Sequence, residues 1–406
     1  MSQAKAGRAQ DKLIATMRKD HAANILICPL DWGTGHAARV QLIAYELKKR
    51  GHKVILAVPP SLARTSDYDI YNKIISLPSP SVRYSSQLPL PLALLLQLPL
   101  FLFTFLSDRC RLPGILRRHS IDLVISDNRF GLWTKKVPCI YITHQLRVMM
   151  PRALRFASAP ASAIHRAIAS RYDQCWVPDM PGEENLSGLL SHMCRKPPRT
   201  RYIGILSRFA IIQPPDGSQQ PLPSTPYTLA LLSGPEPQRS ILEDIIMAQR
   251  HRLPGQLVIV AGKPEDDDKK GKRDSDSNSG SGDRKVVLRI AWADSRRLKS
   301  LVEQASFIIC RSGYSTVMDL VSAGRTALLV PTPGQPEQEY LAGYLSPRHG
   351  FSMVSQKELA AGVIPVDEKA GTDPPAKERA GELIITEWLA AGNRLLSQAL
   401  DDILLH

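Results

Sequence analysis

One stretch, from Arg311 to Leu345, brings together an arginine, several hydroxyls, glycine and carboxylates. It opens with Arg-Ser-Gly at the end of an apolar, strand-like segment, where a helix is expected to begin. The free N–H groups at a helix N-terminus attract an anion, and glycine lets the backbone approach it. Asp319 follows Thr316 by three residues, so both side chains are expected on one side of that helix. This set suits a nucleotide sugar: arginine and hydroxyls for the pyrophosphate, Asp319 for the ribose, and Glu337-Gln338 for the sugar.

Two other side chains have the chemistry of a general base and its partner. His36 follows the glycine-containing turn DWGTG, and Asp127 follows the apolar segment IDLVIS. Because neutral imidazole titrates near working pH, His36 is the candidate base, and Asp127 could orient it as in a His–Asp pair. The plainer alternatives are a structural loop histidine and a carboxylate that caps a turn or helix. His144, after a further apolar segment, is either an acceptor-side ligand or a satisfied histidine at a sheet end.

Alternating strand-like and helical segments are expected to position these side chains. Segment 24–29 is apolar, 38–50 carries an apolar helical stripe and 53–58 is apolar again, with the glycine turn between the first two. Strand, glycine loop, helix and strand in this order predict a βαβ unit and a parallel sheet. Ligands of such sheets bind at the carboxyl ends of the strands, where His36 and Asp127 fall. The other predicted strands are 121–126, 137–143, 227–233, 257–261, 286–290, 307–310 and 326–331.

The composition indicates a globular protein with a basic first half. A length of 406 residues favours two domains, and 43% hydrophobic with 22% charged residues argues against a disordered chain. Residues 1–205 hold 29 Lys and Arg against 13 Asp and Glu, a balance of +16, whereas residues 206–406 hold 23 against 25, a balance of −2. A basic half suggests an anionic partner. A membrane surface or phospholipid acceptor is favoured over nucleic acid, because the basic residues are not interleaved with aromatics in a nucleic-acid motif.

Cysteine usage and the N-terminus bear on the compartment. The six cysteines show no CxxC spacing, as expected of buried, reduced thiols in a cytosolic protein. The first 24 residues are polar and basic without an apolar core, so no signal peptide is expected. We therefore expect a cytoplasmic protein, with a peripheral place on the inner face of the membrane as an extension of that expectation. The oligomeric state is left open.

Segment 88–106, LPLPLALLLQLPLFLFTFL, approaches the length of a membrane span. Its three prolines and one glutamine, and its place within a βαβ pattern, argue against a transmembrane helix. Two interpretations remain: a buried helix, or a hydrophobic patch that enters the membrane interface. Nearby arginines, which could meet lipid phosphates, favour the patch. They are Arg109, Arg111, Arg117 and Arg118, and the whole predicted contact region is 88–118.

Composition shifts predict the domain boundaries. A segment rich in Pro, Ser and Gln separates two βα series and is expected to be a linker, and a charged low-complexity segment in the second series is expected to be a disordered insertion. The predicted parts are a flexible N-terminus 1–23, an acceptor-side domain 24–210, a linker 211–226, a nucleotide-sugar domain 227–375 with the insertion 262–285, and a C-terminal helix 376–406.

The motifs WGTGH, ISDNR, THQ, GILSR and RSGYSTVMD…PGQPEQEY, taken together, resemble glycosyltransferase family 28 in its MurG-like group. There is a weaker resemblance to glucuronosyl and plant glucosyl transferases. The resemblance implies the α/β fold called GT-B, in which two Rossmann-like domains with parallel sheets face each other across a cleft. It also implies a donor on the second domain, an acceptor mostly on the first, a C-terminal helix that returns to the first domain, and inverting transfer with no metal or other cofactor.

The resemblance also assigns roles by position. Asp319 stands where the family has a longer Glu, and THQ replaces the family's His-Glu-Gln-Asn, which predicts an acceptor other than the peptidoglycan lipid. The implied donor ligands are Arg208, Ser233, Gly234, Arg311, Ser312, Gly313, Ser315, Thr316, Asp319, Gln335, Glu337 and Gln338. The implied acceptor-side residues are Gly33, Thr34, Gly35, Asn128, Arg129, Thr143, His144 and Gln145, beside the catalytic pair His36 and Asp127.

The sequence therefore predicts a metal-independent inverting glycosyltransferase. Its donor would be a nucleotide-diphosphate sugar, most simply a UDP-sugar, and its acceptor a hydroxyl that is lipid-linked or membrane-associated. One alternative is an isomerase of the nucleotide-sugar 2-epimerase type, which shares the architecture but needs more carboxylates around the sugar. Another is a non-catalytic subunit that binds the donor or acts as a membrane scaffold.

Overall fold

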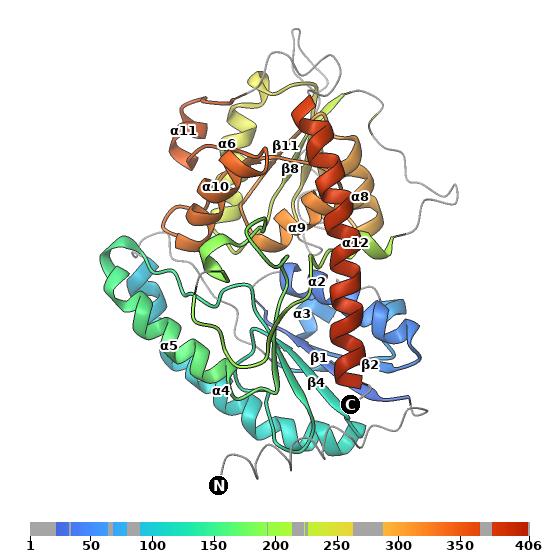
Figure 1. Ribbon diagram of the computed structural model, residues 1–406. Coiled ribbons are helices and arrows are strands. Elements are labelled where there is room, and N and C mark those ends of the chain that lie inside the picture. The colour runs from blue at the N-terminus through green and yellow to red at the C-terminus, as the bar shows by residue number, and fades with distance from the viewer. Residues whose placement is uncertain are drawn as a thin grey trace. The chain divides into compact units, whose positions relative to one another are not determined.

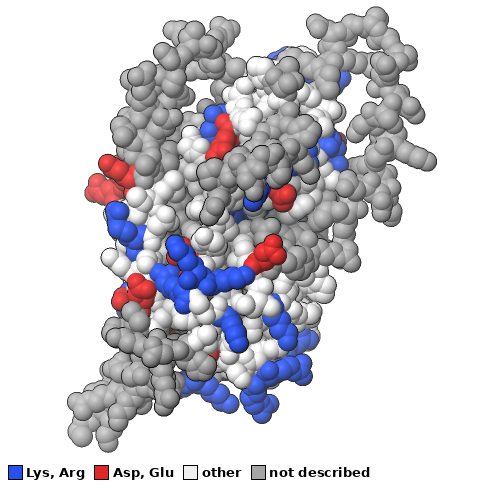
Figure 2. Space-filling model, turned by 90° about the vertical axis from the view of Figure 1, so that its right-hand side faces the viewer, with Lys and Arg blue, Asp and Glu red and all other residues white. Residues whose placement is uncertain are grey.

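The computed structural model describes residues 22–31, 34–63, 68–78, 90–192, 194–212, 223, 226–262, 287–365 and 376–404. The chain divides into two compact units, with the boundary between Arg208 and Phe209. Residues from Thr386 onward return to the first unit. On the face shown in Figure 2, blue Lys and Arg side chains predominate over red Asp and Glu on the first unit, in line with its basic composition.

The first unit is built on a parallel sheet whose described strands follow the order β3-β2-β1-β4-β5-β6-β7. The strands are apolar along most of their length because a parallel sheet is covered on both faces. The pattern 24–29 and 53–58 predicts β1 and β2 with the observed bounds. The strands are β1 (Asn24–Pro29), β2 (Lys53–Val58), β3 (Lys73–Ser76), β4 (Leu123–Asp127), β5 (Cys139–Ile142), β6 (Gln174–Val177) and β7 (Thr200–Tyr202).

Helices cover both faces of this sheet (Figure 1). Leu112 and Leu116 of α4 and Ala169 of α5 pack in one cluster with strand residues of one face. Helix α2 buries its apolar stripe, and Gly51, with a φ of 84°, allows the turn that ends it. The helical segments are α2 (Thr34–Lys49), α3 (Pro60–Ala63), η1 (Tyr68–Ile70), α4 (Leu90–His119), η2 (Arg152–Ala157), α5 (Ser158–Ala169) and η3 (Gly188–Leu190), and η4 (Arg208–Ile211) spans the boundary to the second unit.

The second unit repeats the plan, with described strands in the parallel order β10-β9-β8-β11-β12-β13. Its core is formed by Leu and Ile side chains from strands β8, β9, β11 and β12 and helices α6 and α11. The strands are β8 (Tyr227–Leu231), β9 (Gln256–Val260), β10 (Val287–Ile290), β11 (Phe307–Cys310), β12 (Leu328–Leu329) and β13 (Ser352–Met353). The helical segments are α6 (Gln238–Ala248), η5 (Arg250–Arg252), α8 (Ser295–Gln304), α9 (Tyr314–Ser322), α10 (Pro336–Arg348) and α11 (Gln356–Ala360). A further helix, α12 (Ala376–Leu404), begins in this unit and belongs to the first unit from Thr386 onward.

Each sheet has a point where the strand order reverses direction, and open α/β sheets bind ligands at such points. In the first sheet this point lies between β1 and β4, where Pro29 pairs with Asp127. In the second sheet it lies between β8 and β11, where Leu231 pairs with Cys310. The loops predicted to carry chemistry, after β1 and after β11, therefore both begin at a switch point.

The segment around Glu337 and Gln338 differs from its predicted form. We expected these residues at the end of a Pro- and Gly-rich loop, but both lie in the first turn of α10. Pro336 explains the helix start, because its fixed φ suits the first helical position and its missing N–H is not needed there. Gln335 is the N-cap residue of this helix.

Helix α4 contains most of the strongly apolar segment 88–106 and continues to His119. Leu100, Leu102, Phe103 and Leu106 are exposed, with Leu102 at 58% and Phe103 at 68%. A buried helix is therefore wrong for this part of the segment, and the surface-patch interpretation fits its described side chains. Among the described residues, no helix is long and apolar enough to cross a membrane.

The last helix, α12, packs tightly against the first unit through two glycines. Gly204 has a φ of 77°, and a Cβ built there would lie 2.2 Å from Cα of Gly392. Arg50 pairs with Asp401 at 3.4 Å, and Arg201 pairs with Asp402, so charged side chains hold the end of the helix. Leu396, Leu400 and Ile403 are buried along it.

Candidate active site

His36 and Asp127 meet at the switch point of the first sheet. His36 lies in the first turn of α2, and Asp127 is the last residue of β4. The distance from His36 Nδ1 to Asp127 Oδ2 is 3.1 Å. The Asp127 side chain is fully buried and that of His36 is 15% exposed. The parallel sheet thus brings together the two predicted residues, which are 91 positions apart in the sequence.

Arg39 belongs to the same cluster, although no motif pointed to it. Its Nε donates to Asp127 Oδ2 at 2.7 Å, and its Nη2 pairs with Asp127 Oδ1. Its Nη1 lies 3.1 Å from Nδ1 of His144. The spacing in the sequence could have indicated this role, because His36 and Arg39 are about one helical turn apart and can contact the same residue.

The neighbours of Asp127 and His36 determine the protonation state of both side chains. Burial alone would raise the pKa of Asp127, but Arg39 and His36, by their charge and hydrogen bonds, outweigh burial and hold that pKa well below its ordinary value. Burial, and then the charge of Arg39, lower the pKa of His36, although Asp127 acts in the opposite direction. Near neutral pH, Asp127 is therefore a carboxylate and His36 a neutral imidazole.

The other residues predicted on the acceptor side lie at the start of α2 and after strands β4 and β5. Gly35 lies in the first turn of α2, Thr34 begins that helix, and Gly33 lies outside the described residues. Thr143 is buried, and its Oγ1 accepts from the Gln145 N–H at 3.1 Å. Asn128 has a φ of 55° and accepts at Oδ1 from the Tyr141 hydroxyl at 3.1 Å.

Most donor-side predictions gather at the switch point of the second sheet. Ser233 and Gly234 follow β8, and Ser312 and Gly313 follow β11 and lead into α9. Gly313 is the N-cap residue of α9, and a Cβ there would lie 3.9 Å from the Thr316 hydroxyl. A side chain at this position would therefore stand beside one of the groups expected to bind phosphate.

Gln338 of α10 contacts both the loop after β11 and the segment after β12. The Ser312 hydroxyl donates to the backbone carbonyl of Gln338 at 2.8 Å. Gln338 Oε1 in turn accepts from the Thr332 N–H at 2.9 Å. Ser312 is fully buried and serves this link, whereas Ser315 and Thr316 remain half-buried near the start of α9, and Asp319 lies one turn further along the same helix.

Two arginines assigned to ligands by position make most of their hydrogen bonds inside the protein. Arg311 is 1% exposed, and its guanidinium donates to the carbonyls of Val330, Pro331 and Gln238 and to Gln356 Oε1. Arg129 is equally buried and forms a fork to Asp108, with distances of 3.1 and 2.7 Å. The Nη groups of Arg311 are engaged inside the protein and only its Nε has no hydrogen-bond partner, while the fork of Arg129 is occupied by Asp108. Neither arginine therefore presents a free guanidinium fork to a phosphate or an acceptor.

Replacing Arg311 with methionine is therefore expected to affect stability rather than donor binding. Loss of the guanidinium leaves buried carbonyls without donors, at about 1–3 kcal/mol for each unsatisfied group. Denaturant unfolding should show a loss of that order, while calorimetry with UDP gives an affinity close to that of the wild type. Arg296→Met, at an exposed arginine of the same unit, is the control. A large loss of UDP affinity with unchanged stability would restore the ligand role.

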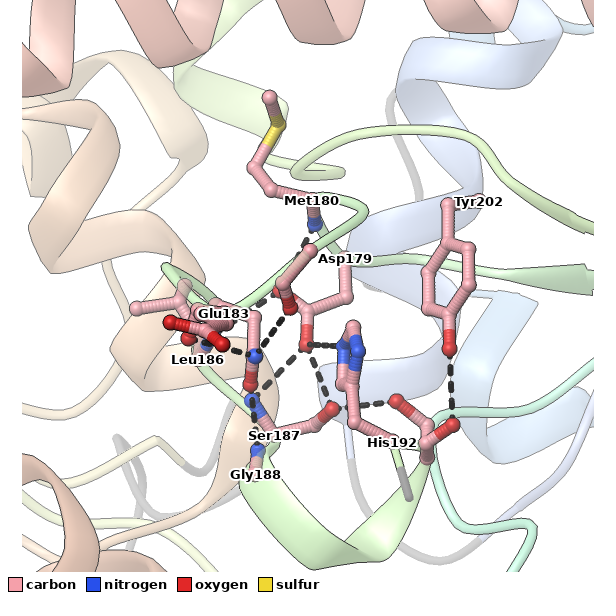
Figure 3. Close-up of polar contacts among 11 residues, drawn as sticks. Asp179, Met180, Glu183, Leu186, Ser187, Gly188, His192 and Tyr202 are labelled. Carbon is pink, nitrogen blue, oxygen red and sulfur yellow. Dashed lines mark hydrogen bonds and ion pairs between the residues drawn. The ribbon is translucent and has the colours of Figure 1, made fainter. Parts of the chain in front are cut away.

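A Ser–His–Asp cluster in the first unit has a structural arrangement (Figure 3). Asp179 Oδ2 accepts from the Ser187 hydroxyl at 2.5 Å and lies 3.2 Å from His192 Nε2, and both Asp179 oxygens accept loop N–H groups. In a catalytic triad the histidine bridges the serine and the carboxylate. Here serine and histidine bind the same carboxylate, so Ser187 has no base. Asp179 instead fixes its loop, and its carbonyl accepts from the Gly204 N–H at 3.1 Å.

No group of three or more His, Cys, Asp or Glu side chains in the described part of the chain is arranged to hold a metal ion.

Arg208, another residue assigned to the donor by position, begins η4 at the boundary of the two units and is half-buried.

Comparison with known sequences identifies the second unit. Residues 241–372 match the model of the glycosyltransferase family 28 C-terminal domain. The chain is 24% identical over 342 residues to a UDP-N-acetylglucosamine--N-acetylmuramyl-(pentapeptide) pyrophosphoryl-undecaprenol N-acetylglucosamine transferase of Bradyrhizobium sp. strain BTAi1, covering 80% of this chain and 83% of the relative. A protein of the same name from Pasteurella multocida is 32% identical over 99 residues, 20% of this chain and only 28% of the relative's length.

Solved structures show the same fold at low sequence identity. The glycotransferase of kitacinnamycin has a TM-score of 0.60 at 16% identity and covers 95% of this chain and 99% of its own. CalG4, the calicheamicin glycosyltransferase, has a TM-score of 0.60 at 15% identity, with 95% and 98% covered. SnogD from Streptomyces nogalater has a TM-score of 0.58 at 14% identity, with 94% and 100% covered.

Two parallel-sheet α/β units with these neighbours define a protein of the GT-B class, as the resemblance predicted. The match of the second unit to the family 28 C-terminal domain and the relatives named above support the predicted resemblance to MurG-like glycosyltransferases. The predicted fold class and enzyme class are confirmed.

Proposed function

We propose that this chain transfers a sugar, with inversion, from a nucleotide-diphosphate sugar to a hydroxyl of a lipid-linked acceptor. UDP is the simplest nucleotide, since the relatives named above are N-acetylglucosamine transferases with UDP-N-acetylglucosamine and a pyrophosphoryl-undecaprenol substrate in their names. The observation that carries the proposal is the pairing of His36 with a buried, ionised Asp127 at a sheet switch point. A neutral histidine oriented by a carboxylate is what an inverting transfer requires as its base.

The proposed step uses His36 as the proton acceptor. Asp127 can only accept, so the His36 proton lies on Nδ1 and the lone pair of Nε2 is available. Nε2 takes the proton of the acceptor hydroxyl while its oxygen bonds to the anomeric carbon of the donor. The bond from that carbon to the diphosphate breaks, and its electron pair leaves with the nucleoside diphosphate. No metal ion or other cofactor takes part.

The leaving diphosphate would be stabilised on the second unit. The N-terminus of α9 presents backbone N–H groups, and the hydroxyls of Ser315 and Thr316 lie in its first turn. Arg208 is the remaining arginine of the original assignment, because Arg311 is engaged internally. Asp319 would bind the ribose hydroxyls, and Gln338, whose Oε1 is fixed by the Thr332 N–H, would present its amide N–H groups to the sugar.

Asp319→Ala tests the donor half of this proposal. Loss of the ribose contact is expected to weaken UDP binding about tenfold or more, since a charge-assisted hydrogen bond contributes roughly 1.5–3 kcal/mol. Isothermal calorimetry of the wild type, Asp319→Ala and Asp244→Ala measures this, and the exposed Asp244 on α6 is the control. Equal UDP affinity in all three proteins would remove Asp319 from the donor site.

A membrane surface is the second partner that we propose. The exposed apolar side chains of α4 are accompanied by the exposed Arg111, Arg117 and Arg118 further along the helix. On η2 and α5 of the same unit, Phe156 and Ile164 are 79% and 64% exposed, and Arg152 and Arg155 are exposed beside Phe156. Apolar residues flanked by arginine suit an interface of acyl chains and anionic headgroups. A lipid-linked acceptor would be reached from such a surface.

Sedimentation with anionic vesicles tests this surface. The wild type is expected to pellet with the vesicles at low salt and less at high salt, because part of the attraction is screened. Leu102→Ser/Phe103→Ser should abolish pelleting. Met353→Ser/Val363→Ser, which changes two exposed apolar residues of the second unit, should leave it unchanged. Equal pelleting of both double variants would contradict the assignment to α4.

A further inference from the structure

Arg39 is a buried cation that neither the motifs nor the family resemblance single out. It lies on α2, one turn after His36, and only 1% of it is exposed. Burying an arginine requires that its donors be paired. Here the donors meet two groups of the candidate active site, Asp127 and His144.

The nitrogen atoms of the Arg39 guanidinium contact two different residues. Nε and Nη2 form a fork on the two Asp127 oxygens, the arrangement in which arginine binds a carboxylate most strongly. Nη1 points to His144 Nδ1 at 3.1 Å. An ion pair with a purely structural role would need the fork alone, so the contact with His144 extends the role of Arg39.

These contacts determine where the protons are. A guanidinium only donates, so His144 Nδ1 must accept and the His144 proton lies on Nε2. An ionised Asp127 only accepts, so His36 Nδ1 carries a proton and its Nε2 does not. One histidine is thereby a base at Nε2 and the other a donor at Nε2.

Arg39 also changes the charge that His36 experiences. The charged or titratable neighbours of His36 are Arg39 on the same helix, Asp127 at the end of β4 and His144 after β5. An unpaired Asp127 would favour a protonated His36. Because Arg39 neutralises that carboxylate, the neighbourhood carries no net charge and neutral imidazole is favoured.

We propose that Arg39 is a positioning residue of the transfer reaction, which keeps Asp127 ionised and holds His36 and His144 in opposite tautomers, a base and a donor. This inference rests on the proposed function for its catalytic meaning. The tautomers themselves can be measured without any substrate.

Nitrogen-15 NMR of the histidine rings is the direct test. The wild type should show neutral His36 protonated at Nδ1 and neutral His144 protonated at Nε2. In Arg39→Gln, the pH at which His36 gains its proton should rise by about one unit or more, because the neighbouring carboxylate loses its partner. His144 should become a mixture of tautomers. Arg39→Lys keeps a charge beside Asp127, so it should keep the titration of His36 close to that of the wild type while releasing His144.

Arg129→Gln is the matched control, since it removes a buried arginine from Asp108 without touching either histidine. It should leave both ring spectra as in the wild type. In the transferase assay, the acid limb of kcat against pH should move upward with His36 in Arg39→Gln, a shift that a loss of packing alone would not produce.

Two failures can be told apart. Unchanged tautomers and titration in Arg39→Gln, or His36 protonated at Nε2 in the wild type, would overturn the inference about Arg39. No transfer by the wild type, with the ring spectra as expected, would overturn the proposed function, and with it the catalytic meaning of Arg39.

Discussion

His36→Ala is expected to lower kcat by roughly 10²- to 10⁴-fold, the usual contribution of a general base. The reason is the geometry of the first unit: Nδ1 is held by Asp127, and no other imidazole of the cluster offers a basic Nε2, because His144 carries its proton there. UDP affinity should be unchanged, since His36 is not among the proposed donor groups, which apart from Arg208 lie on the second unit. Steady-state kinetics with calorimetry measure both quantities on the same protein.

His119→Ala is a suitable control, because this histidine ends α4 and has no contact with the cluster. It should retain the turnover of the wild type. A His36→Ala protein with turnover within a few-fold of the wild type would contradict the role of His36 as the base.

Gly204→Ala is expected to destabilise the first unit strongly. The left-handed φ of 77° costs a residue with a Cβ roughly 1–2 kcal/mol. The new Cβ would also lie 2.2 Å from Cα of Gly392, and a backbone atom cannot move away by changing rotamer. Overpacking of this kind adds about 1–3 kcal/mol or more, through a shift of α12 away from the segment that leads to Arg208.

Gly182→Ala separates the two costs. Gly182 has a φ of 97° with nothing within 4 Å of its Cβ position, so it should show the conformational cost alone. Denaturant midpoints of the two variants give the difference directly. Equal losses in both variants would mean that α12 does not press against Gly204.

Local pattern predicted much of the fold. Continuous apolar segments between glycine turns predict β1, β2 and β11 with the observed bounds, because parallel strands are buried on both faces. The segment 326–331 shows the limit: only Leu328 and Leu329 are paired in β12, since pairing depends on the neighbouring strands and not on the segment itself.

Arginine was the residue type that sequence reasoning placed least well. Arg311 stands at the end of a strand beside hydroxyls, the pattern of a phosphate ligand, yet its side chain turns inward to backbone carbonyls. Arg39 has the appearance of an ordinary helix charge, yet it is buried between Asp127 and His144. Both outcomes depend on where a long side chain finds acceptors in three dimensions, which the local sequence does not specify.

The exposure of the apolar side chains of α4 could not be predicted from the sequence either. A run such as LPLALLLQLPLFLF suits a core or a lipid interface equally well. The structure distinguishes them for the described side chains, because Leu102 and Phe103 of this run are exposed, and α4 packs on the sheet only further along, at Leu112 and Leu116.

The central claim is that this chain transfers sugar from a UDP-sugar to a lipid-linked hydroxyl with His36 as the base. The most direct measurement is UDP release from a panel of UDP-sugars, with and without a polyprenyl-diphosphate-linked sugar in anionic vesicles. The account predicts UDP release that requires the acceptor, is matched by a product heavier by one sugar, and is lost in His36→Ala. Release of UDP without the acceptor, or interconversion of the UDP-sugar with no transfer to any lipid-linked hydroxyl, would contradict it.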